Sequence, residues 1–107
     1  MTTFDQRKDA FENRFAHDEA LQFKASARRN KQLGLWAAAL LGKAGAEAET
    51  YATEVVAADF EAAGDEDVFR KIRADFDAAG VAQSDHQIRR TMDELLAKAI
   101  EDVKTTG

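Results

Sequence analysis

Proline is absent from all 107 residues of the chain. Proline is the residue that cannot donate the backbone hydrogen bond of a helix interior, and average proteins contain about 5% of it. Nothing in this sequence therefore forbids long, uninterrupted helices. Alanine, glutamate, lysine and leucine, which favour helix, are abundant. No segment alternates strictly between apolar and polar residues as a strand does. The sequence predicts an all-α fold.

Glycines and capping residues divide the chain into four predicted helices. A glycine is favoured just past the end of a helix, where the backbone becomes left-handed. The glycines in such places are Gly42, Gly45, Gly64 and Gly80. Ser84, followed three residues later by Gln87, forms a capping-box pattern before the last helix. We expect helices at 3–41, 46–63, 66–79 and 85–104.

Each predicted helix carries apolar residues at helical spacing. They are Leu33, Trp36 and Leu40; Tyr51, Val55, Val56 and Phe60; Val68, Phe69, Ile72 and Phe76; and Ile88, Met92, Leu95, Ala99 and Val103. A chain of this length can bury one modest core. The pattern therefore predicts one four-helix bundle.

The first predicted helix is too long for its neighbours to cover. A continuous helix over 3–41 would extend about 58 Å, whereas the others would span roughly 20–30 Å. Phe4, Phe11 and Phe15 share one face of its N-terminal part, and this apolar stripe stops at 18–22. We expect a mobile N-terminal arm at 1–16 and a four-helix domain at 17–107. Alternatively, the helix bends and these phenylalanines pack onto the bundle.

Charge is unevenly distributed along the chain, whose net charge is −5. Residues 24–43 contain five cations and no acid, whereas residues 44–107 contain seven cations and fifteen acids. Within the basic stretch, Lys24, Arg28 and Lys31 share one helical face, and Arg29 points away from it. We call these three residues the basic collar. It is either a solvated face or a docking patch for an acidic protein surface.

The sequence argues against several other functions. An acidic chain with one small basic collar is a poor general binder of nucleic acid. Cysteine is absent, which excludes disulfides and thiolate metal sites. No apolar run is long enough to span a membrane, and the first residues do not form a signal peptide. We therefore expect a cytoplasmic protein.

Patterns of catalytic or metal-binding residues are incomplete. His17 and His86 lie far apart, and neither belongs to a nucleophile pattern. The acidic stretch 59–70 resembles a calcium loop, but it ends in Arg70 where a bidentate glutamate is required. Gly42–Lys43 lacks the preceding glycine and the following hydroxyl of a phosphate-binding loop. We expect no enzyme activity, no metal and no cofactor.

Two blocks of the sequence resemble a known family. The first block, residues 15–42, reads FAHDEALQFKASARRNKQLGLWAAALLG, and the second, residues 64–72, reads GDEDVFRKI. Together with the opening MTTFDQRKDAF, they resemble the small alphaproteobacterial proteins described as the zeta subunit of the F1Fo ATP synthase. The resemblance extends over nearly the whole chain and is loosest at 45–61 and 80–107.

The resemblance implies a four-helix domain whose mobile N-terminal segment inserts between catalytic subunits of the F1 head and blocks ATP hydrolysis. Its partners would be the alpha, beta and gamma subunits, and in function it would be similar to the mitochondrial ATPase inhibitor protein. The inhibitory segment would be about Thr2 to Ala16. The residues expected to bind the partner are Phe4, Arg7, Lys8, Phe11, Arg14 and Phe15, together with the basic collar. The alternative is a helical adaptor that docks through the basic collar and inhibits nothing.

Overall fold

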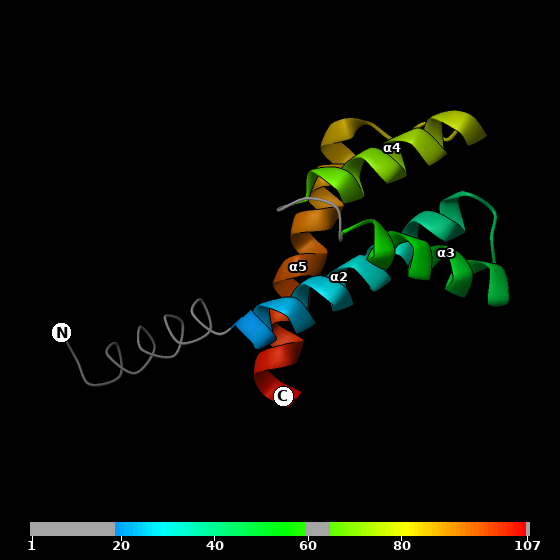
Figure 1. Ribbon diagram of the computed structural model, residues 1–107. Coiled ribbons are helices and arrows are strands. Elements are labelled where there is room, and N and C mark those ends of the chain that lie inside the picture. The colour runs from blue at the N-terminus through cyan, green and yellow to red at the C-terminus, as the bar shows by residue number, and fades with distance from the viewer. Residues whose placement is uncertain (1–18, 60–64, 107) are drawn as a thin grey trace, which may run out of the picture.

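A computed structural model describes residues 19–59 and 65–106, which form four α-helices (Figure 1). The helices are α2 (Glu19–Leu40), α3 (Ala46–Ala58), α4 (Glu66–Ala79) and α5 (Asp85–Thr106). These two ranges contain no strand. The predicted all-α, four-helix fold is confirmed.

The predicted signals at helix ends are confirmed around α4 and α5. Gly80 ends α4 with φ 71°, in the left-handed conformation that glycine adopts without strain. Ser84 and Gln87 form the predicted capping box before α5. The backbone N–H of Gln87 donates to Ser84 Oγ at 3.1 Å, and the backbone N–H of Ser84 donates to Gln87 Oε1 at 2.8 Å.

Helix α3 is shorter than predicted and ends at Ala58 instead of residue 63. Asp59 follows as a turn whose amide donates to Val56 O at 3.3 Å, so the last turn tightens. Extending the helix would place Asp59 and Glu61 in its last turn, where the negative end of the helix dipole disfavours acids. Phe60 and Gly64 lie outside the described residues.

Helices α2 and α5 contain 22 residues each and are the longest of the described part. Helix α2 ends at Leu40, one residue before the predicted end. The predicted helical stretch 3–18, and with it the arm at 1–16, falls outside the described residues. The described structure therefore tests the long first helix only from Glu19 onwards.

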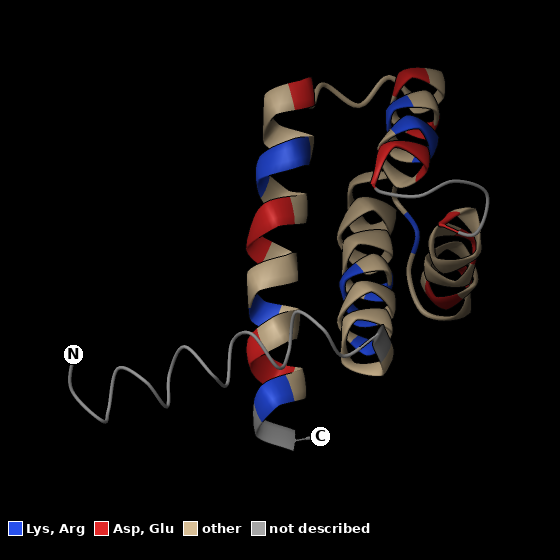
Figure 2. Ribbon diagram, turned by 60° about the vertical axis from the view of Figure 1, so that its left-hand side comes forward, with Lys and Arg blue, Asp and Glu red and all other residues tan. Residues whose placement is uncertain are grey.

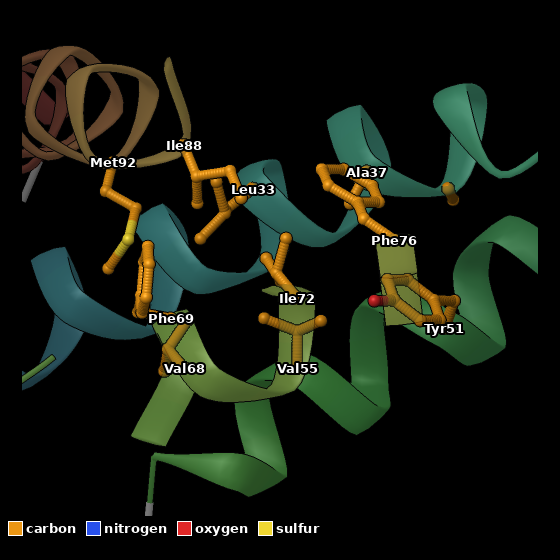
Figure 3. Close-up of a cluster of buried hydrophobic side chains, with 11 residues drawn as sticks. Leu33, Ala37, Tyr51, Val55, Val68, Phe69, Ile72, Phe76, Ile88 and Met92 are labelled. Carbon is orange, nitrogen blue, oxygen red and sulfur yellow. The ribbon is translucent and has the colours of Figure 1, made fainter. Parts of the chain in front are cut away.

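The main core lies where all four helices meet (Figure 3). Helix α2 packs against α3 and α5, and α4 also contacts both α3 and α5 (Figures 1 and 2). The buried core residues are Leu33, Ala37 and Ala38 of α2, Tyr51 and Val55 of α3, Val68, Phe69, Ile72 and Phe76 of α4, and Ile88 and Met92 of α5. Trp36 packs edge-on against Phe76, with the ring centroids 5.7 Å apart.

The core-facing side of α2 differs in one position from the prediction. Leu40 is 39% exposed, whereas Ala37 is buried and Leu41 packs against the core. The core residues along this part of the chain thus include Leu33, Ala37 and Leu41, the last of which follows α2. Leu40 is the last residue of α2, and it lies at the surface there.

The N-terminal half of α2 packs in a smaller cluster. Ala25 of α2 is buried against Ala99 and Val103 of α5, and Leu21 and Ile100 pack around them. Small side chains let two helices approach closely. Helices α2 and α3 also approach each other closely at Gly34, where an added Cβ would lie 2.6 Å from Ala52 Cα of α3. Helix α2 is thus held between α3 and α5.

Candidate functional site

The six predicted partner-binding residues of the arm lie outside the described residues. They are Phe4, Arg7, Lys8, Phe11, Arg14 and Phe15. Their role stays a prediction. The described chain begins at Glu19, the first residue of α2. Helix α2 is therefore the first described element after the predicted arm.

The basic collar lies on α2, which packs between α3 and α5 (Figure 2). Arg28 Nη1 is 3.8 Å from Asp102 Oδ2 of α5, and Lys31 Nζ is 4.0 Å from Glu49 Oε2 of α3. Lys24 is exposed. All of these groups reach solvent, so the two pairs contribute little to stability. They do offset much of the positive charge that an acidic partner would meet.

Arg29, which the sequence places away from the collar, is buried in the bundle with 1% of its surface exposed. Its Nε donates to Asn30 Oδ1 at 2.6 Å, and its Nη2 donates to Asp65 Oδ1 at 2.7 Å. Asp65 immediately precedes α4, so this ion pair ties α2 to the start of α4. Charge-assisted hydrogen bonds of this kind are among the strongest in proteins.

A sequence signal for this buried pair exists. Arg29 and Asn30 lie four and three residues before Leu33, so all three occupy one face of α2. Asn30 is also buried, with 1% exposure. Two polar residues on a core-facing stripe need partners, because a buried charge without a partner is very costly. Reading the two adjacent arginines only as surface cations misses this.

An open cleft of about 350 Å³ lies at the end of the bundle formed by α3, α4 and the end of α2. Tyr51 Oη donates to Asp75 Oδ2 at 2.7 Å, and Lys71 Nζ donates to the same oxygen at 3.1 Å. Lys71 also lies 3.6 Å from Glu54 and above the Tyr51 ring, 5.1 Å from its centroid. These charged groups satisfy one another, which is the arrangement of a structural network.

We expect the protein to lose stability above about pH 10 because of Tyr51. Burial, and then the hydrogen bond to Asp75, raises the pKa of Tyr51 above its ordinary value. A raised folded-state pKa contributes stability that is complete below the unfolded value of about 10 and is lost as the pH rises above it. Tyr51 is the sole tyrosine, so tyrosinate absorbance follows it alone. Tyrosinate should form only with unfolding, and Tyr51→Phe should flatten the alkaline decline in unfolding free energy. Tyrosinate formation near pH 10 in the folded protein would contradict this.

The comparisons with known proteins assign the chain to a family. The family model of ATPase inhibitor subunit zeta matches residues 1–102. The chain belongs to this family. The match includes residues 1–16, where the arm is predicted, and all of α2, α3 and α4, and it confirms the resemblance found in the sequence. The search of curated proteins gives no match.

A protein with a solution NMR structure is also similar to this zeta-family chain. The two sequences are 48% identical, and the structures superpose with a TM-score of 0.70. The similarity covers 79% of this chain and 96% of the other. The bundle described above is thus also the fold of a relative solved by NMR.

The described part of this zeta-family chain has no candidate metal site and no candidate membrane span. Among residues 19–59 and 65–106, no group of three or more histidine, cysteine or acidic residues is placed to hold a metal ion. His86 is exposed in the first turn of α5, and His17 lies outside the described residues. No helix in these ranges is both long and apolar enough to cross a membrane.

Proposed function

We propose that this protein inhibits ATP hydrolysis by inserting its N-terminal arm, residues 1–16, between catalytic subunits of the F1 head of an ATP synthase. The family match carries the proposal, because it starts at residue 1 and therefore includes the arm as well as the bundle. The partners are the alpha, beta and gamma subunits. The protein is a regulatory subunit without catalytic activity, held at the cytoplasmic side of the inner membrane through F1.

In this mechanism Phe4, Phe11 and Phe15 are the apolar anchors of the inserted arm. Arg7, Lys8 and Arg14 meet charges around them. Aromatic residues and arginine are the usual anchors of protein interfaces.

The basic collar has a secondary role in this mechanism. Two of its three cations already have a carboxylate of α3 or α5 within 4.0 Å. An adaptor that docks through the collar alone would have to compete with these pairs. We therefore assign the main contact to the arm, with Lys24, Arg28 and Lys31 aiding the encounter with F1.

Removing residues 1–15 should abolish inhibition of ATP hydrolysis by purified F1 and leave the helical circular dichroism and melting temperature of the bundle nearly unchanged. The double change Phe11→Ala and Phe15→Ala should raise the concentration for half-inhibition at least about 30-fold, because one anchor contributes about 2 kcal/mol or more. Inhibition titrations and melting curves on the same preparations measure both effects.

The alternative, in which the arm phenylalanines pack on the bundle, predicts the reverse result. Deleting large core aromatics typically costs roughly 3–5 kcal/mol of stability each. A much lower melting temperature with normal inhibition by the folded fraction would therefore exclude the anchor role.

A further inference from the structure

Phe23 is the most exposed large apolar side chain in the described part of the chain. It is 63% exposed, and Leu40, the next most exposed, is 39% exposed. Both belong to α2 and lie near its opposite ends. A single exposed apolar side chain needs no explanation. The surroundings of Phe23 distinguish it.

Phe23 borders a groove between the N-terminal half of α2 and the end of α3. The groove has a volume of about 130 Å³ and is lined by Phe23, Ser26, Ala27 and Asn30 of α2 and by Val56 and Asp59 at the end of α3. We call it the Phe23 groove. An apolar cavity of about 150 Å³ accommodates a benzene ring. The Phe23 groove is slightly smaller than this, so it can hold one branched aliphatic side chain or part of a phenyl ring.

The charge at the groove selects its occupant further. Asp59 lies at the C-terminal end of α3, where the helix dipole is also negative. Within the described residues no lysine or arginine forms an ion pair with Asp59. An apolar side chain accompanied by an arginine or lysine would thus fit the groove and its acidic rim.

The position of the groove along the chain identifies the partner. Phe23 lies seven residues beyond the end of the arm, and seven residues reach at most about 25 Å even when fully extended. A standard interface buries about 800 Å² on each partner. The width of such a patch is comparable to the distance that these seven residues can reach. A protein that takes up the arm therefore comes close to the Phe23 groove.

We propose that the Phe23 groove is a second docking site for the protein that receives the arm, and that it holds one apolar side chain of that protein next to a cation paired with Asp59. The proposal rests on the proposed function, because it takes F1 as that protein. Once the arm is inserted, contact at the groove is intramolecular, so one small pocket is enough to add affinity.

Two other occupants of the groove are less favoured, for different reasons. A stable dimer of two copies needs about 1,200 Å² or more of buried surface, which one pocket for a single side chain does not provide. The chain's own arm would have to reverse direction at the start of α2 to reach it. Both possibilities give distinct results in the test.

The test uses the full chain and measures its dissociation constant for purified F1. Phe23→Ala should weaken binding about 30-fold, which corresponds to the loss of one interface anchor. Asp59→Lys should also weaken binding, by about tenfold, because it opposes the partner's cation. Leu40→Ala is the matched control, since it removes an exposed apolar side chain from the far end of α2, and it should leave binding unchanged.

The outcomes separate the groove from the arm. Weaker binding of F1 by Phe23→Ala, with an unchanged melting temperature, supports the docking site. The same loss of binding is expected when Phe23→Ala is added to the double change Phe11→Ala and Phe15→Ala. If the wild-type chain binds F1 and Phe23→Ala binds equally well, the groove proposal is overturned and the proposed function stands. Tighter binding by Phe23→Ala indicates the chain's own arm in the groove, and a changed oligomeric state with unchanged F1 binding indicates a second copy. Either result overturns the proposal, as does a wild-type chain that does not bind F1, which overturns the proposed function as well.

Discussion

Replacing Asp65 with alanine should destabilise the bundle by about 3–5 kcal/mol, more than replacing its buried partner Arg29 with methionine. Asp65 is 49% exposed at its side chain, whereas that of Arg29 is 1% exposed. Without Asp65, the guanidinium stays buried and retains only the Asn30 carbonyl among the two side-chain acceptors described for it. Leaving one charge of a buried pair without its partner costs about 3–5 kcal/mol.

Arg29→Met should cost only about 1–3 kcal/mol. The remaining Asp65 carboxylate can turn to water. The main cost is that the buried side-chain oxygen of Asn30 loses its hydrogen-bond donor. The double change should therefore resemble Arg29→Met alone, so the two single effects are not additive. Denaturant unfolding of the four proteins, followed through the single tryptophan, measures this cycle. Equal costs for the two single changes, or a double change that sums them, would show that Arg29 is not held in the interior by Asp65.

The helices and the main core follow directly from the sequence. Helix α4 begins and ends where predicted, because the acids of its first turn and Gly80 at its end are local signals that no tertiary contact opposes. The face of Val68, Phe69, Ile72 and Phe76 is buried as predicted. The apolar spacing decides its orientation in any packing of the four helices.

Other features depend on tertiary contacts that periodicity does not contain. Leu40 is exposed at the end of α2, although its spacing from Leu33 and Trp36 predicts burial. The early end of α3, in contrast, has a local cause in the acids there. The interaction of Arg29 with Asp65 joins residues 36 positions apart. Helical geometry already turns Arg29 away from the basic collar, but only the packing of the helices shows that its partner is Asp65. The Phe23 groove likewise forms from two helices, and no single segment of the chain indicates it.

The second large effect expected is at Phe76, which is fully buried in the last turns of α4. Phe76→Ala should lower the free energy of unfolding by about 3–5 kcal/mol, because it removes a whole ring from a core that cannot collapse around the space. At roughly 4–8 °C per kcal/mol for a domain of this size, the melting temperature should fall by at least about 12 °C. Phe76→Leu keeps most of the apolar volume and should cost less than half as much.

Trp36 makes this change visible at the site itself. Its ring meets that of Phe76 at an interplanar angle of 65°, and it is the sole tryptophan of the chain. Even in the folded state, Phe76→Ala should alter the emission of Trp36, because water or a rearranged side chain then borders the indole. Leu40→Ala, at the end of α2, the helix that carries Trp36, should change neither the emission of Trp36 nor the melting temperature appreciably. If Phe76→Ala instead leaves stability within about 1 kcal/mol of the wild type, then α4 does not complete the core, and the four-helix arrangement described above is wrong.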